Sequence, residues 1–281
     1  MDPPREVLMK KLERVLAATD GSERAEEAVR QGARLAAAFG ASLLALFVIE
    51  RDRPHDGDVE REAEAALERA RAIAASAGSS ADARIVGGDV GDTLVAEAES
   101  GGIDLLCIGP DAGALGGALR VGRVAAHLLR EATCSTLVAR PAADAFPERI
   151  LCGVDGSEES GETALEAATI AASTRAELRL LHVVPVFRGD NSEWTLDPDE
   201  AGPPELEPAV TAATSRGVIA VREMAMGRPE HALLAVAERD ACDLVVVGHR
   251  GISGMRRVLL GSVSEHVAHH AKASVLVARG E

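Results

Sequence analysis

The strongest constraint on the fold of this 281-residue chain is that its sequence repeats itself. Residues 15–23, with the sequence VLAATDGSE, return as ILCGVDGSE at residues 150–158, 135 positions later. Residues 122–140 align without gaps on residues 261–279, 139 positions later. The second copy has therefore gained four residues overall, and the chain is expected to fold as two similar units.

A prior of ~150 residues per domain makes each copy long enough to bury its own core. We expect domain 1 at residues 1–141 and domain 2 at residues 148–281, with a linker at residues 141–149. The extra length falls at residues 185–208, a long acidic and proline-rich loop. The helix after that loop is expected to be shorter than its counterpart at residues 59–77.

Each copy alternates short apolar runs with Ala-, Glu- and Arg-rich stretches of helical spacing, which is typical of βαβ units. The apolar runs are mostly apolar on both faces, as in a parallel sheet covered by helices on both sides. The expected strands are residues 14–19, 42–49, 82–87, 104–109, 136–140, 149–154, 177–184, 218–224, 243–248 and 274–279. We expect an α/β fold of two tandem Rossmann-like domains, each a five-stranded parallel sheet with helices on both faces and right-handed crossovers.

The composition argues against several partners. With 30 Lys and Arg against 45 Asp and Glu, the net charge is −15, and the chain has four Phe, one Trp and no Tyr. Such a chain repels a phosphate backbone and lacks stacking aromatics, so we expect no nucleic-acid partner. No apolar run approaches the ~20 residues that span a bilayer, and no secretory signal opens the chain. We expect a cytoplasmic protein with no membrane partner.

The four cysteines, Cys107, Cys134, Cys152 and Cys242, form no Cys-x-x-Cys pair. Three of them lie in apolar, strand-like runs. We interpret all four as small buried hydrophobic residues without redox function.

In parallel sheets ligands bind beyond the carboxyl ends of the strands, and the loop after the fourth strand of the second copy is the most informative such position. Gly248 and Gly251 open this loop, and Gly261 and Ser262 would begin the next helix. A glycine-rich loop lets backbone N–H groups approach an anion, and a helix N-terminus favours phosphate. The hydroxyls of Ser262 and Ser264 could donate to the same phosphates. Three arginines and no acidic residue occur in this loop, which predicts a local anion site in an acidic chain.

The spacing Gly-x2-Gly-x9-Gly-Ser resembles the ATP-binding signature of the universal stress protein family. The Val-Asp-Gly-Ser opening, the repeat length and the closing Ser-Val-Leu-Val agree with it, and the resemblance covers nearly the whole chain as two tandem copies. It implies a Rossmann-like unit of the adenine nucleotide α-hydrolase-like type. In one subgroup of the family this unit holds ATP with Mg²⁺ or Mn²⁺.

Carried over residue by residue, the resemblance implies the ATP contacts of the second domain. Asp155, after the first strand, would contact the nucleoside with Gly153 and Val154 beside it, and backbone at Val183 would meet adenine. The phosphates would lie against Gly248, Arg250, Gly251, Gly261, Ser262, Val263 and Ser264. The family often has histidine where this chain has Arg250, so the phosphate contacts differ there in detail.

The first domain departs from this pattern at three positions. Asp111 stands where the second domain has an arginine, Ala112 where it has a glycine, and Arg123 where it has a serine. A carboxylate repels a triphosphate, a Cβ restricts the loop backbone, and an arginine replaces a small hydroxyl at a crowded helix start. We expect the first domain to bind ATP weakly or not at all.

Simpler interpretations of the same residues remain open. Asp20 and Asp155 could be helix N-caps, because Asp-Gly-Ser-Glu has the form of a capping box. The glycine pattern could be an ordinary connecting turn. His266 and His270 lie four apart on an expected helix, but no third ligand is visible, and we predict a solvated helix face and no metal site.

The chain has no Walker motif, no G-x-G-x-x-G after a strand and no G-x-S-x-G elbow, so we predict no catalytic residue. The leading hypothesis is a stress-response ATP sensor or regulator, with the nucleotide in domain 2 and an unidentified protein partner. One alternative is a nucleotide-independent interaction module. Another is a slow ATPase.

The family resemblance also implies that the two domains pack as a pseudo-dimer through their last strands, near residues 136–140 and 274–279. A further homodimer of whole chains is an open expectation. The acidic loop at residues 188–208, which contains Trp194, would border the nucleotide, either as a solvated connection or as a lid.

Overall fold

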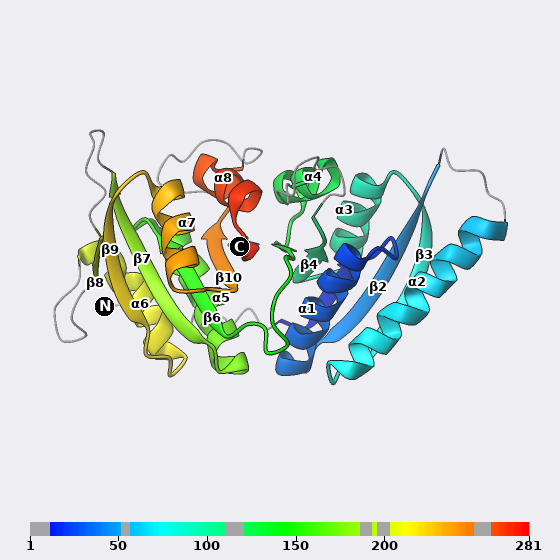
Figure 1. Ribbon diagram of the computed structural model, residues 1–281, viewed down its shortest axis with the longest axis horizontal. Helices are drawn as coiled ribbons and strands as arrows, with labels where there is room; N and C mark the ends of the chain where they lie inside the picture. Colours follow the sequence, from blue (N-terminus) through cyan, green and yellow to red (C-terminus); the bar gives the residue numbers. More distant parts are fainter. Residues whose placement is uncertain are drawn as a thin grey trace, which may run out of the picture.

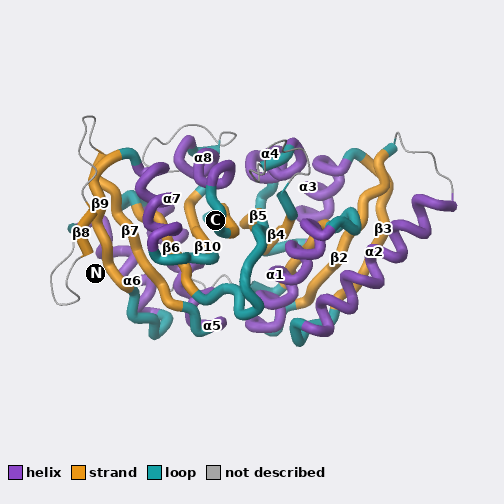
Figure 2. The backbone as a smooth tube through the Cα atoms, in the orientation of Figure 1, coloured by secondary structure: helices purple, strands orange, loops and turns teal. Residues whose placement is uncertain are grey.

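The centre of the computed structural model is one 11-stranded sheet with the order β3-β2-β1-β4-β5-β11-β10-β6-β7-β9-β8 (Figure 1). The structure describes residues 12–51, 57–110, 121–185, 193–195, 203–249 and 260–280. Neighbouring strands are parallel except at the β5–β11 and β8–β9 pairs. Helices lie on both sides of the strands (Figure 2). The expected α/β architecture of two tandem Rossmann-like domains is confirmed.

The first domain follows the expected alternation of strand and helix. Its elements are β1 (Arg14–Ala18), α1 (Glu23–Phe39), β2 (Ser42–Glu50), α2 (Gly57–Ser76), β3 (Ala81–Gly88), α3 (Val90–Gly101), β4 (Leu105–Ile108), α4 (Arg123–Glu131) and β5 (Ser135–Val138).

The second domain repeats this order with additions after its second strand. Its elements are β6 (Arg149–Val154), α5 (Glu158–Thr174), β7 (Glu177–Pro185), β8 (Glu193–Thr195), η1 (Pro204–Leu206), α6 (Glu207–Ser215), β9 (Val221–Gly227), α7 (Pro229–Arg239), β10 (Leu244–Gly248), α8 (Ser262–His270) and β11 (Ser274–Ala278).

Three expectations are tested by these additions. The helix after the acidic loop is shorter, as predicted, because α6 has 9 residues where α2 has 20. The loop itself contains a strand that was not predicted, β8, which pairs antiparallel with β9 at the outer edge of the sheet. The second-domain sheet therefore has six strands instead of five. The strand β9 begins at Val221, three residues later than expected.

Alternating side chains of the strands build cores on both faces of the sheet. In β1, Val15 packs on one face with residues of α1 and α2, whereas Leu16 packs on the other with residues of α3 and α4. In the second domain α5 and α6 cover the first of these faces, and α7 and α8 cover the other. Burial on both faces explains why the strands are apolar throughout.

The two domains join where β5 pairs antiparallel with β11, with Leu137 opposite Leu276. Both leucines are fully buried and belong to a core cluster that extends through the two domains. The expected pairing of the last strands is confirmed, and it makes the two sheets continuous.

Candidate functional site

The residues predicted to hold a nucleotide in domain 2 come from the ends of three neighbouring strands. The strand β6 lies between β10 and β7, and both neighbours run parallel to it. Their carboxyl ends therefore meet at one edge of the sheet, where Val154, Val183 and Gly248 lie. The helix α8, which follows β10, begins at the same edge with Ser262 (Figure 1).

The turn after β6 is held by hydrogen bonds from Ser157 to Asp155. Oδ1 of Asp155 accepts from the backbone N–H of Ser157 at 3.0 Å and from its hydroxyl at 2.6 Å. Ser157 is the N-cap of α5, and its Oγ accepts from the N–H of Ser160. The alternative that Asp155 itself caps the helix is therefore wrong, and the same holds for Asp20, because Ser22 caps α1. The aspartates shape the turn that precedes each helix.

Between Asp155 and Ser157, Gly156 has a φ of 84°, a conformation that favours glycine. A Cβ on this glycine would lie 2.9 Å from Cγ of Glu205, so η1 packs directly on the turn. Sequence reasoning did not find Glu205, because the contact joins segments about 50 residues apart and no spacing indicates it.

The start of α8 lacks a side-chain cap. Its N-cap is Gly261, whereas α1, α3 and α5 are capped by Ser22, Asp89 and Ser157. The first N–H groups of a helix have no partner within the helix and carry partial positive charge. An uncapped helix start at this edge of the sheet is suited to an anion.

Two hydrogen bonds fix this helix start to the end of β10. The N–H of Gly261 donates to the carbonyl of His249 at 2.9 Å. The hydroxyl of Ser264, which is buried, donates to the carbonyl of Gly248. Ser262 is exposed at the first position of the helix, and Val263 follows it, half-buried. The Ser264 hydroxyl is therefore engaged in a hydrogen bond within the protein, whereas Ser262 lies at the surface.

On the other side of β6, Val183 is buried in β7 opposite Ala225. Beside it, the ring Nδ1 of His182 lies 2.9 Å from the carbonyl oxygen of Val154. This contact joins the ends of β6 and β7. Sequence reasoning missed His182, although a histidine within an apolar strand is a usable signal.

The predicted contacts of Arg250 and Gly251 lie outside the described residues, as do Asp111 and Ala112 of the first domain. The corresponding helix start of that domain is described. Gly122 is the N-cap of α4 and likewise lacks a side-chain cap, but the first helical residue is the exposed Arg123. The two domains therefore share an uncapped helix and differ in the side chain at its first position.

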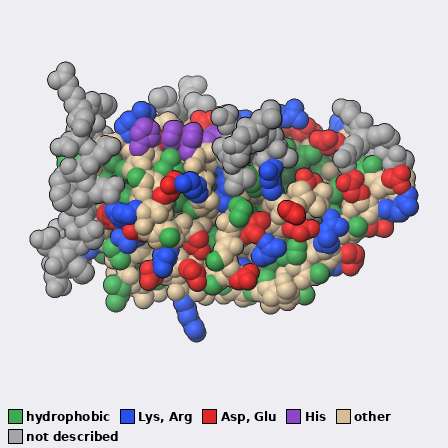
Figure 3. All heavy atoms as spheres, viewed as in Figure 1, with side chains coloured by type: hydrophobic (Ala, Val, Ile, Leu, Met, Phe, Trp, Pro, Cys, Tyr) green, Lys and Arg blue, Asp and Glu red, His purple; other side chains and the backbone are tan. Residues whose placement is uncertain are grey.

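Histidines gather in a row on one face of the molecule (Figure 3). The rings of His266 and His270 stack at 4.1 Å between centroids, and His231 of α7 lies 5.5 Å from His266. Burial and the neighbouring His270 lower the pKa of His266. Within the described ranges, no three His, Cys, Asp or Glu side chains are placed to hold a metal ion.

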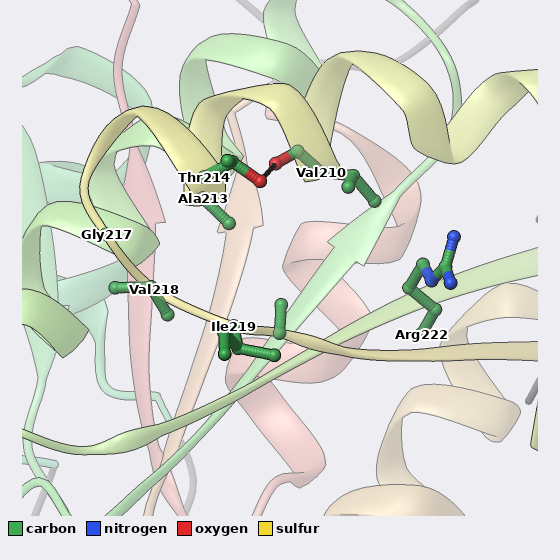
Figure 4. A pocket seen from close by; sticks show the side chains of 8 residues that line it. Val210, Ala213, Thr214, Gly217, Val218, Ile219 and Arg222 are labelled. Carbon is green, nitrogen blue, oxygen red and sulfur yellow. Dashed lines mark hydrogen bonds between the residues drawn. The ribbon is translucent and has the colours of Figure 1, made fainter. Parts of the chain in front are cut away.

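A groove of about 340 Å³ lies elsewhere, between α6 and the chain that leads into β9 (Figure 4). Its lining is mainly apolar, from Val210 to Ile219, with Arg222 at one side. The Thr214 hydroxyl at its wall already donates to the carbonyl of Val210. The groove is at the amino end of β9, away from the strand ends that carry the candidate site. No helix in the described part of the chain is long and apolar enough to cross a membrane.

Comparisons with known proteins agree with this architecture. The model of the universal stress protein family matches residues 11–140 and again residues 147–279. A universal stress protein of Methanocaldococcus jannaschii is 36% identical over 139 residues, covering 47% of this chain and 82% of the relative. One of Mycobacterium tuberculosis is 32% identical over 179 residues, covering 57% and 56%.

Among solved structures, a universal stress protein from Archaeoglobus fulgidus superposes with a TM-score of 0.76 at 21% identity. The superposition covers 96% of this chain and all of that one, which supports the tandem fold. Since the family model matches both repeats, this chain belongs to the universal stress protein family and carries two of its domains in tandem.

Proposed function

We propose that this protein is a stress-response regulator that binds ATP in its second domain and changes its contacts with a protein partner when the nucleotide is bound. The observation that carries the proposal is the start of α8. A nine-residue helix begins behind an uncapped glycine, Gly261, at the carboxyl edge of the sheet. This is the part of an α/β fold where anionic ligands bind.

In this proposal the N–H groups of Ser262 and Val263 and the Ser262 hydroxyl bind phosphate, together with Arg250 and Gly251. Gly248 and Ser264 hold the helix start in place through their hydrogen bond. Asp155, with Gly153 and Val154, positions the nucleoside, and backbone at Val183 meets adenine. All these groups bind or position the ligand, so the role is regulatory instead of catalytic.

A divalent ion would reach this site with the nucleotide. Mg²⁺ is usually held by one or two carboxylates and by phosphate oxygens, and it keeps several waters. In this proposal the phosphates and bound waters would supply most of the coordination of Mg²⁺ or Mn²⁺.

The first domain is proposed to bind no ATP. Its α4 has the same uncapped start, but Arg123 replaces the small Ser262 at the first helical position. A bulky side chain there leaves less room for phosphate against the backbone.

The test is a calorimetric titration of ATP with Mg²⁺ into the wild type, Gly261→Asp and Gly122→Asp. Gly261 has a φ of −63°, so aspartate fits the backbone, and aspartate is a good N-cap. The new carboxylate repels phosphate by about 3 kcal/mol at ~5 Å and an effective dielectric of ~20. We expect one-to-one binding that Gly261→Asp abolishes and Gly122→Asp preserves.

Loss of binding in Gly122→Asp instead would move the site to the first domain. A wild type that binds no ATP, ADP or cyclic AMP would favour the nucleotide-independent interaction module. Trp194 is not a suitable reporter, because β9 and β7 separate its strand from β6.

A further inference from the structure

Arg140, the second residue after β5 in the first domain, is fully buried at the contact between the domains. Its Nη2 donates to the carbonyl of Ala268 at 2.9 Å, in the last turn of α8 of the second domain. No salt bridge to this guanidinium occurs within the described ranges. The positive charge is placed instead at the carbonyl end of α8, where the helix dipole is negative.

The backbone of Arg140 is fixed as well. Its N–H donates to Oγ of Ser274 at 2.9 Å, and its carbonyl accepts from Nε2 of Gln31 at 2.7 Å. The Ser274 hydroxyl donates in turn to Oε1 of Gln31 at 2.8 Å. Elements of both domains therefore hold this arginine against α8.

Arg279, the counterpart of Arg140 in the second copy, forms the reciprocal contact. Its Nη2 donates to the carbonyls of Leu129 at 3.1 Å and Arg130 at 2.6 Å, in the last turn of α4. Its N–H donates to Oγ of Ser135 at 3.1 Å. Each domain thus caps the last helix of the other, but only Arg140 caps the helix at the candidate nucleotide site.

We infer that Arg140 of the first domain is a positioning residue for nucleotide binding by the second domain. The inference rests on the proposed function, because α8 is the helix whose start is proposed to bind phosphate. A helix of nine residues is about 13 Å long and moves as one body. The Arg140 contact at one end therefore sets where the N–H groups at the other end lie.

Other contacts also hold this helix, among them its packing against α7. The Ser264 hydroxyl holds its first turn to β10, and Val267 and Ala268 are buried against the sheet. Removal of the Arg140 guanidinium takes away the hydrogen bond from the first domain to the last turn, which stays in an apolar cluster with Ala125 and Leu129 of that domain. By linkage, nucleotide bound at the start of α8 also stabilises the contact of Arg140 with its end.

The matched pair Arg140→Met and Arg279→Met tests the inference. Methionine is unbranched and fills the space of the stem without the charge. Both variants remove one cap between the domains, so both are expected to lower the midpoint of thermal unfolding. Only Arg140→Met is expected to weaken the binding of ATP with Mg²⁺, by about 2- to 30-fold, the range of residues that act on a site indirectly. Calorimetry well below the unfolding midpoints measures this difference.

Equal affinities in the two methionine variants, with ATP binding by the wild type intact, would overturn the inference and leave the proposed function standing. A wild type that binds no nucleotide would overturn both. If Arg140→Met does not fold, Ser274→Ala and its counterpart Ser135→Ala replace the pair. Ser274→Ala then has to weaken ATP binding and Ser135→Ala has to leave it unchanged, or the inference is wrong.

Discussion

Buried polar side chains in this protein are compensated in two different ways. Glu223 is fully buried, and its carboxylate accepts from Arg179 at 2.9 Å and from Arg239 at 2.8 Å. Arg140 is equally buried, but its guanidinium donates to backbone carbonyls, that of Ala268 in α8 and that of Ala139. Burying a charge costs free energy unless hydrogen bonds or an opposite charge replace water. Removing the arginine partners of Glu223 or the carbonyl partners of Arg140 would therefore lower the free energy of unfolding.

The cysteines behave as small apolar residues. All four are buried, as predicted. Burial raises the pKa of Cys152 to about 12 and that of Cys242 to about 11. A thiol with such a pKa carries almost no thiolate at neutral pH, so redox chemistry at these positions is disfavoured.

Acid should destabilise the protein through His266. The pKa of this residue is lowered by burial and by His270, with smaller effects from His231 and Arg228, while Glu230 acts in the opposite direction. As the pH falls below about 6.5, the unfolded chain takes up the proton first, so the free energy of unfolding decreases. We expect His266→Gln to lose less stability than the wild type between pH 7.5 and 5.0, measured by urea unfolding.

His127→Gln is the control for this measurement. His127 occupies the corresponding place in the first domain, but its Nε2 lies 3.3 Å from a carboxylate oxygen of Asp92 instead of beside another histidine. This variant separates the effect of losing any histidine at this helix position from the effect of losing the ring of His266 that stacks on His270. An equal benefit from both variants would contradict the assignment to His266.

At the scale of elements, the sequence predicted well the strands that the two repeats share, because burial on both faces leaves a clear apolar signal. It failed where tertiary contacts decide. The strand β8 has three residues and exists through its pairing with β9. The apolar residues before Val221 were predicted as strand, yet pairing with β7 begins only there, and Ile219 is 96% exposed.

The candidate site shows the same limit. The strand ends and the uncapped start of α8 follow from the repeat and from glycine spacing. The histidine in the apolar run of β7 is a local signal, but its contact with the end of β6 and the contact of Glu205 with Gly156 join residues far apart in the chain, and no spacing indicates these partners. The serine caps were missed for a different reason. Asp-Gly-Ser-Glu allows either the aspartate or the serine to be the N-cap, and with Gly156 at positive φ the N-cap of α5 is Ser157.

The caps of α1 and α5 provide a matched comparison. Ser22→Ala and Ser157→Ala each remove an N-cap acceptor, so each should lower the free energy of unfolding by about 1 kcal/mol. The Ser157 hydroxyl also donates to the carboxylate of Asp155 at 2.6 Å, and alanine removes this hydrogen bond. Only Ser157→Ala should therefore also weaken ATP binding, as calorimetry would show. The same loss of affinity in Ser22→Ala would contradict a site confined to domain 2.

At the scale of the whole molecule, the two domains share one sheet and two of its core clusters. The seam at β5 and β11 buries Leu137 and Leu276 completely. Cooperative units of unfolding follow contiguous packing, not the boundaries of a sequence repeat.

Urea unfolding should therefore show one transition for both domains, with the same midpoint by circular dichroism and by fluorescence. Leu137→Ala, in the seam, should lower the stability of the whole chain by about 2–5 kcal/mol without splitting the transition. Two separate transitions in the wild type would show that the domains unfold independently despite the common sheet.

The antiparallel seam of β5 and β11 joins two halves of one chain, which affects how the contact responds to dilution and whether its two sides must be identical. Because both halves belong to one polypeptide, they meet at an effective concentration in the millimolar range, whatever the abundance of the protein. A pair of identical subunits must present the same residue on both sides of a twofold contact. Here Gln31 faces Ser274 whereas Glu166 faces Ser135. Because the two halves are joined in one chain, they can differ in sequence across a contact that dilution does not separate.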